Sequence, residues 1–169
     1  MNLKLRLLCA TALIALVTSG CGQKDTSSAN TAANPATPAT PAGPRTLEIT
    51  AGDNMKFNVT TLEAKAGEQL TVVLTNVGTQ PKEVMGHNWI LLKIGTDLEA
   101  FDKAAALAKE SDYFPTSMAG QVLAHIPLLG PRKSGEITFT APTTPGEYPF
   151  LCSFPAHFQV GMKGVLIVK

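Results

Sequence analysis

Eight short runs of alternating or β-branched residues, separated by turn-forming residues, constrain the fold of this chain more than any other feature. The runs cover residues 47–50, 55–59, 69–75, 88–94, 122–126, 136–140, 146–151 and 164–168. Sequences such as Gly-Asp-Asn and Gly-Pro-Arg-Lys-Ser-Gly separate several of them. Short strands at such regular intervals, with turns between them, predict an all-β sandwich or barrel.

Residues 97–110 break this pattern. They are rich in alanine and place their larger apolar residues at helical spacing. Asp97 is a suitable N-cap, and Pro115 lies beyond the far end. The segment predicts one helix inserted between strands.

The first 44 residues have a different composition from the rest. Lys4 and Arg6 precede an apolar run, residues 7–17, and small residues then lead to Cys21. This order predicts a secretory signal peptide over residues 1–20. The junction resembles the lipobox of bacterial lipoproteins, which implies that Cys21 carries lipid. Two alternatives are signal cleavage without lipid and a transmembrane anchor, for which the run is shorter than the ~20 residues required.

Residues 21–44 consist mainly of Ala, Thr, Pro, Ser, Asn and Gly. Such a segment lacks the apolar surface needed to fold and predicts an extended, flexible tether. The folded domain is then expected over residues 45–169. Lipid on Cys21 would place it at a bacterial membrane, on the periplasmic face or at the outer membrane.

The charge of the chain argues against nucleic acid as a partner. The whole chain has 14 Lys and Arg against 13 Asp and Glu, and loss of residues 1–20 removes only Lys4 and Arg6. The remaining charges are nearly balanced and form no basic block.

Residues 152–162 hold a thiol, an imidazole and a thioether: Cys152, His157 and Met162. A second imidazole, His87, lies in a distant strand-like run. Cys9 would leave with the signal peptide and Cys21 would be lipidated, so Cys152 has no disulfide partner. Singly, these residues are more often a buried histidine, a packing methionine and an inert thiol. Together they are the ligand set of a blue copper site.

At this point the chain resembles the azurins, a cupredoxin family, over residues 45–169. The matching stretches are Met-Gly-His-Asn-Trp at 85–89, Ala-His at 124–125, Cys-Ser-Phe-Pro-Ala-His at 152–157 and Met-Lys-Gly at 162–164. The resemblance implies a Greek-key β-sandwich with one inserted helix. It also implies one copper ion, with His87, Cys152 and His157 in a plane, Met162 as the long axial ligand and the Gly86 carbonyl opposite.

The resemblance also implies roles for residues around the copper ligands, and the chain differs from typical azurins in two respects. Asn88 and Ser153 match the pair that joins the two ligand-bearing segments and donates hydrogen bonds near the thiolate. His125 is expected to titrate without ligating, and Trp89 to pack in the core. The gap from His157 to Met162 is one residue longer than in typical azurins and resembles plastocyanins and auracyanins. The positions of the azurin disulfide appear as Arg45 and Glu68, which suit a salt bridge.

The predicted function is electron transfer by a type 1 copper protein that is not an enzyme. Typical partners of the family are a c-type cytochrome or a respiratory or denitrifying enzyme, and the protein is expected to be a monomer. His157 would be the electron port, within an apolar docking patch. The candidate patch residues are Met85, Pro155, Ala156, Phe158 and Val160. Replacing Phe158 by Lys is expected to slow electron exchange without changing the copper spectrum.

Three other functions remain as alternatives. A copper-delivery cupredoxin would share the fold and most of the ligands. A multicopper oxidoreductase needs more histidines than the three in this chain, and a two-copper centre needs a second Cys on the ligand loop. A metal-free structural sandwich is the remaining possibility.

Overall fold

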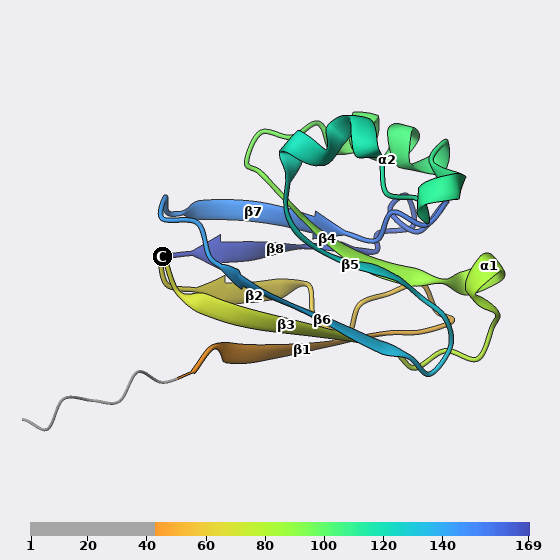
Figure 1. The fold of residues 1–169 in the computed structure, drawn as a ribbon, viewed down its shortest axis with the longest axis horizontal. Helices are drawn as coiled ribbons and strands as arrows, with labels where there is room; N and C mark the ends of the chain where they lie inside the picture. The colour runs from red at the N-terminus through yellow and green to blue at the C-terminus, as the bar shows by residue number, and fades with distance from the viewer. Residues whose placement is uncertain (1–42) are drawn as a thin grey trace, which may run out of the picture. The chain divides into compact units, whose positions relative to one another are not determined.

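The computed structural model describes residues 43–169, and these form two β-sheets with a helical segment between strands (Figure 1). The strands are β1 Arg45–Ala51, β2 Thr61–Ala64, β3 Gln69–Asn76, β4 His87–Leu92, β5 Val122–Leu129, β6 Ser134–Thr140, β7 Gly146–Leu151 and β8 Lys163–Val168. The helices are α1 Lys82–Met85 and α2 Leu98–Ala106, followed by two 3-10 turns, Lys109–Ser111 and Thr116–Gln121.

The two sheets differ in size and in the direction of their pairing. One has three strands in the order β1-β3-β6, and the other has five in the order β2-β8-β7-β4-β5. β1 pairs parallel with β3, and β2 pairs parallel with β8, whereas the remaining pairs are antiparallel. This arrangement confirms the predicted β-sandwich.

The core lies between the sheets. Alternate residues of β3, Leu70, Val72 and Leu74, are fully buried and face apolar residues of the larger sheet. Trp89 is fully buried at its centre, with its ring 5.6 Å from that of Phe150. The prediction that Trp89 packs in the core is therefore confirmed. Its indole N–H is buried without a hydrogen-bond partner.

Seven of the eight predicted runs correspond to strands, although the run at 88–94 extends two residues past the end of β4, and the prediction for residues 55–59 is wrong. Met55 has a positive φ of 55°, and only Phe57 forms an isolated bridge, to Ala51. The side chain of Asn58 accepts a hydrogen bond from the backbone N–H of Thr50. The alternating pattern here belongs to a turn that folds back on β1, which side-chain hydrogen bonds stabilise in place of a ladder.

The strand that the sequence did not predict is β2. It has four residues and alternates exposed and buried positions. Its parallel pairing with β8 spans about 100 residues of sequence, so no local signal such as a hairpin turn marked it.

The inserted helix forms but is shorter than predicted. The Asp97 side chain accepts from the backbone N–H of Ala100, as expected of an N-cap. α2 ends at Ala106, and Ala108, with φ −98° and ψ 41°, has left the α-helical conformation. A separate 3-10 turn, Lys109–Ser111, follows, and Asp112 and Tyr113 then take positive φ angles of 54° and 61°.

Cys152 and the start of β1 lie at opposite ends of the sandwich. Gly146 at the start of β7 pairs with Val168, whereas Leu151 at its end leads directly to Cys152. Arg45 contacts Glu63 and Glu68 and lies near Lys169, so β1 begins at the end opposite to Cys152. Figure 1 shows the start of β1 and the C-terminus at the same end.

The predicted signal peptide, the lipid site Cys21 and the predicted tether up to residue 42 lie outside the described residues. Within residues 43–169, no helix has the length and hydropathy needed to cross a membrane.

Candidate metal centre

The loop between β7 and β8 spans residues 152–162 and is closed by its own backbone hydrogen bonds. The N–H of Cys152 donates to the carbonyl of Met162 at 3.1 Å. The N–H of Met162 donates to the carbonyl of His157 at 2.9 Å, and the N–H of His157 donates to that of Phe154 at 3.0 Å. These bonds hold the two ends and the middle of the loop close together.

Two residues of this loop have left-handed backbone conformations. Gly161, directly before Met162, has φ 91°, which glycine adopts without steric cost. Ala156, directly before His157, has φ 71°, which costs a residue with a Cβ roughly 1–2 kcal/mol. The chain therefore bends sharply just before His157 and again just before Met162.

His87 lies next to this loop because β4, which it begins, pairs with β7. β4 pairs antiparallel with β7, with Ile90 opposite Leu151, so His87 lies beside the residues that follow β7. The side-chain donor atoms of His87, Cys152 and His157 all lie within 4.8 Å of one another. The Cys152 Sγ is 3.4 Å from His157 Nδ1, and the two imidazole centroids are 4.9 Å apart.

The two residues proposed for axial positions are both buried. Met162 is fully buried, and its backbone forms hydrogen bonds with the backbones of Cys152 and His157. Gly86 directly precedes His87, and a Cβ there would lie 2.6 Å from the Lys82 carbonyl and 2.9 Å from Leu128 Cγ. Only glycine fits this close approach, which was not deducible from the sequence pattern.

Burial keeps the three candidate ligands uncharged in the absence of a metal. It raises the pKa of the Cys152 thiol to about 12, although the backbone N–H groups of Asn88 and Phe154 donate to the sulfur and oppose the shift. Burial, together with His87, lowers the pKa of His157 to about 4. Burial also lowers the pKa of His87. The nearby Gly52 carbonyl opposes this shift, although it is not aligned well enough to form a hydrogen bond with the His87 ring.

These residues fit a bound metal ion. Both ring nitrogens of His87 are buried without a hydrogen-bond partner, an arrangement that is costly unless something else binds them. Atoms within 4.8 Å of one another can share one ion at bond lengths of about 2.0–2.3 Å. One sulfur and two imidazoles, with a methionine nearby, form the donor set of type 1 copper.

Asn88 and Ser153 join the two segments that carry the candidate ligands. The Asn88 side chain donates to Ser153 Oγ at 2.8 Å and accepts from the Ser153 backbone N–H at 2.8 Å. Ser153 Oγ in turn donates to the carbonyl of Tyr113 at 2.6 Å. The helical segment is thereby tied to the residue after Cys152, a contact that the sequence did not indicate.

Aromatic rings cover one side of His157. The Phe154 ring centroid lies 4.7 Å from that of His157, and Tyr113 meets Phe154 edge-on at 5.0 Å. His157 itself is only 1% exposed.

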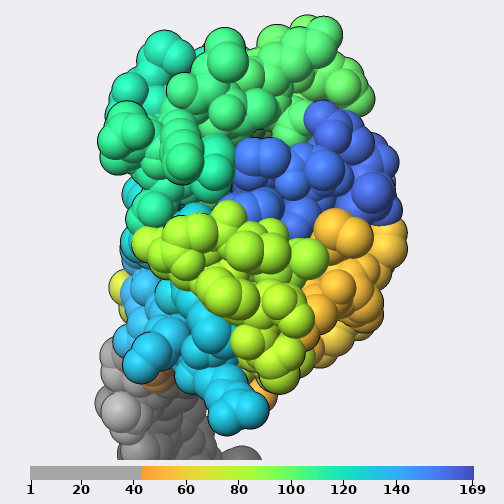
Figure 2. Space-filling view, turned by 90° about the vertical axis from the view of Figure 1, so that its right-hand side faces the viewer, coloured from red at the N-terminus to blue at the C-terminus, as the bar shows by residue number. Residues whose placement is uncertain are grey.

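The surface around this site differs from the predicted docking patch at one residue. Met85 and Pro155 are half-buried, and Ala156 and Val160 are exposed. Phe158, however, is only 2% exposed and packs with Phe101 and other apolar side chains beneath the loop. Its assignment to the docking surface is wrong because its ring points into this second apolar cluster. Figure 2 shows α1 and the 152–162 loop side by side at this end of the molecule.

His125 lies on β5, outside the group formed by His87, Cys152 and His157. It is exposed, and its ring stacks on that of Phe114 with centroids 4.5 Å apart. Partial burial lowers its pKa.

The predicted ion pair between Arg45 and Glu68 is present. Arg45 Nε lies 2.7 Å and Arg45 Nη2 3.0 Å from the two carboxylate oxygens, so the pair is bidentate. The hydrogen bonds with Arg45 lower the pKa of Glu68 to about 2. Arg45 also donates to the Glu63 carbonyl, which joins β1 to the region of β2.

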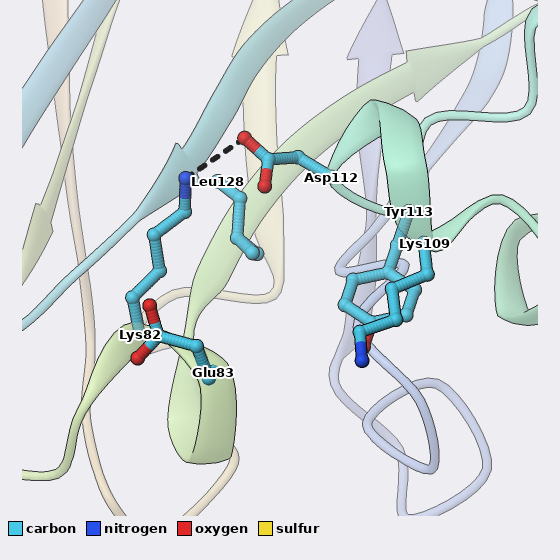
Figure 3. Close-up of a pocket in the computed structure, with 6 residues that line it drawn as sticks. All are labelled: Lys82, Glu83, Lys109, Asp112, Tyr113 and Leu128. Carbon is cyan, nitrogen blue, oxygen red and sulfur yellow. Dashed lines mark hydrogen bonds and ion pairs between the residues drawn. The ribbon is translucent and has the colours of Figure 1, made fainter.

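A small surface hollow lies beside the candidate site and does not include it (Figure 3). Its lining residues are Lys82, Glu83, Lys109, Asp112, Tyr113 and Leu128. Lys82 forms an ion pair with Asp112 across it, at 2.8 Å. Positive and negative side chains are balanced here, so the hollow indicates no ligand of a particular charge.

Comparisons with known proteins agree with this geometry. The family model for copper binding proteins of the plastocyanin/azurin family matches residues 45–169. Azurin from Bordetella pertussis is 37% identical over 123 residues, which are 71% of this chain and 81% of that protein. The outer membrane protein H.8 of Neisseria meningitidis serogroup B is 36% identical over 111 residues, 64% of this chain and 60% of that protein.

The fold is also similar to that of a solved structure. The crystal structure of dithionite-reduced auracyanin from the photosynthetic bacterium Roseiflexus castenholzii superposes with a TM-score of 0.65 and 37% identity. The match covers 73% of this chain and 96% of the auracyanin chain.

Proposed function

The chain belongs to the plastocyanin/azurin family of copper-binding proteins, and from this premise we propose that it carries single electrons between redox proteins. Its cofactor is one type 1 copper ion. The observation that carries the proposal is the buried group of His87, Cys152 and His157, whose donor atoms lie within 4.8 Å of one another.

We propose that His87, Cys152, His157 and Met162 would hold the copper, with the Gly86 carbonyl as a further weak contact. Copper bound there supplies a one-electron couple between Cu(I) and Cu(II). The polypeptide holds the donor set in one arrangement, because the loop is closed by backbone hydrogen bonds and Asn88 and Ser153 fix it to β4. A fixed donor set keeps the structural change on electron transfer small.

Burial of the ligands also bears on the copper-delivery alternative. His87, Cys152, His157 and Met162 are each at most 1% exposed. A partner apo-protein would have to open the loop before it could reach the ion. This arrangement favours retention of the metal, as electron transfer requires.

The docking surface proposed for redox partners is the rim around His157, formed by Met85, Pro155, Ala156 and Val160. Apolar and small side chains of this kind suit the small, weak interfaces of transient redox complexes. A c-type cytochrome or a respiratory or denitrifying enzyme would be such a partner, and the protein would act as a monomer without enzymatic activity.

The proposed location is a bacterial membrane, with lipid on Cys21 and residues 21–44 as a tether after removal of residues 1–20. The similarity to a protein described as an outer membrane protein supports this proposal. Replacement of Cys21 by Ser should move the protein from the membrane to the soluble fraction. Equal membrane association of both forms would contradict lipid anchoring.

The test of the function is titration of the purified protein with Cu(II), followed by absorption spectroscopy. An intense thiolate-to-copper charge-transfer band, absent after replacement of Cys152 by Ser, is the expected result. Rapid electron exchange with a c-type cytochrome should accompany it. A protein with only weak copper bands would contradict the type 1 assignment, and ready transfer of copper to an apo-protein would favour delivery.

A further inference from the structure

One buried carboxylate lies beneath the ligand loop and has no role in the site described so far. Asp102, on the inner face of α2, is only 2% exposed. Gln159, on the ligand loop, donates from Nε2 to Asp102 Oδ2 at 2.7 Å. A buried carboxylate is costly, and one neutral hydrogen-bond donor offsets only part of that cost. Stability alone therefore does not explain its presence.

The preceding residue on each segment is a buried phenylalanine. Phe158 precedes Gln159 on the loop, and Phe101 precedes Asp102 on α2. Both rings belong to one apolar cluster with Ile90, Leu92 and Leu151. The two phenylalanines thus share one apolar cluster, and the residues that follow them, Asp102 and Gln159, share a hydrogen bond.

The docked residues lie between two of the proposed copper ligands. His157 directly precedes Phe158, and Met162 follows three residues after Gln159. The Gly161 N–H donates to the Phe158 carbonyl at 2.9 Å, and the Met162 N–H to the His157 carbonyl at 2.9 Å. Residues 158–159 are therefore joined to both proposed ligands by the chain itself and by these hydrogen bonds, and we expect their position to affect the positions of His157 and Met162.

We propose that Asp102 is a positioning residue of the copper site: by binding Gln159 it anchors the 158–161 segment to α2 and fixes Met162 relative to His157. This inference rests on the proposed function and assigns α2 a part in it. The longer segment between His157 and Met162 would then be held by the helix rather than by the loop alone.

The test compares three variants with a control. Asp102→Leu keeps the branched shape of the side chain and removes the acceptor, and Gln159→Ala removes the donor from an exposed position. Asp102→Asn keeps an oxygen that can accept from Gln159 and should restore the anchor. Lys103→Ala, at the exposed neighbouring position on the same helix, is the control.

The first measurement is amide hydrogen exchange of the metal-free protein. Asp102→Leu and Gln159→Ala should exchange the Gly161 and Met162 amides severalfold faster than the unmodified protein, with the core of β3 unchanged. Asp102→Asn and Lys103→Ala should match the unmodified protein. Unchanged loop exchange in both anchor variants, or equal acceleration throughout the domain, would overturn the proposal.

The second measurement is the reduction potential and absorption spectrum of the copper-loaded proteins. Asp102→Leu and Gln159→Ala should shift the potential and the ratio of the charge-transfer bands, whereas Asp102→Asn and Lys103→Ala should not. A blue unmodified protein with unshifted anchor variants would overturn only the role of Asp102. A colourless unmodified protein would instead overturn the proposed function, while the exchange measurement would still report on the anchor.

Discussion

At the scale of single residues, the site is built from groups that burial keeps neutral. His157 is the sharpest case, because burial lowers its pKa from 6.5 to about 4. Below pH 6.5 the unfolded chain binds a proton at this residue that the folded, metal-free protein does not bind until about pH 4. The free energy of unfolding must therefore fall as the pH drops through this window.

We expect the metal-free protein to lose up to about 3 kcal/mol of stability between pH 6.5 and 4 from His157 alone. The pKa of His87 is also lowered, so its contribution has the same sign. Urea unfolding at pH 7 and pH 4.5, followed by the fluorescence of the single Trp89, measures the effect. Replacement of His157 by Gln should reduce the pH dependence, and an unchanged dependence would contradict this account.

Ser153 shows how one hydroxyl can join three segments. It accepts from Asn88 and donates to the Tyr113 carbonyl, and it is fully buried. Replacement by Ala leaves two buried polar groups unpaired and should cost roughly 2–4 kcal/mol. The matched control is Ser134→Ala, which removes an exposed hydrogen bond to Thr75 and should cost much less. Equal losses in denaturant unfolding would show that the Ser153 hydrogen bonds add little.

At the scale of elements, the sequence predicted those strands whose alternating or β-branched pattern is strong. β7 and β8, which pair with each other on either side of the ligand loop, are examples. Residues 55–59 have the alternation of a strand, but the positive φ of Met55 and the hydrogen bonds of Asn58 make them a turn. β2 is short and pairs with a strand about 100 residues away, so its existence depends on tertiary contacts.

Phe158 shows the same dependence on tertiary contacts. The sequence placed it next to a ligand and predicted an exposed contact residue, whereas α2 provides an apolar cluster that buries it. Phe158→Ala should therefore cost about 3–5 kcal/mol of unfolding free energy. Val160→Ala, at a position 44% exposed, should change it by less than about 0.5 kcal/mol. Similar values for the two variants would contradict the burial of Phe158.

At the scale of the whole molecule, the site joins elements that are distant in sequence. His87 comes from β4 and the other candidate ligands from the loop before β8, with α2 and its following turns packed beside them. The sequence singled out all four side chains by their chemistry and spacing, and the structure brings the donor atoms of His87, Cys152 and His157 together. Sequence reasoning missed Asp102 and the Tyr113 carbonyl as neighbours of the loop, because nothing local links residues 102 or 113 to residues 153–159.

Because the ligands meet only in the folded state, copper should stabilise the whole domain. At a free copper concentration 100 times the dissociation constant, the gain is about 2.7 kcal/mol. The melting temperature should therefore rise with added Cu(II), and Cys152→Ser should lose most of this rise. An equal rise in the variant would mean that copper binds elsewhere.

The position of Arg45 has a consequence for attaching this protein to a surface. β1 begins at the end of the sandwich opposite to Cys152, and β7 alone separates the two ends by about 20 Å. A protein immobilised on an electrode through the Arg45 end would hold its metal a full strand length from the conductor. Tunnelling weakens steeply over such a span, so current would depend on soluble carriers that reach the opposite, open face.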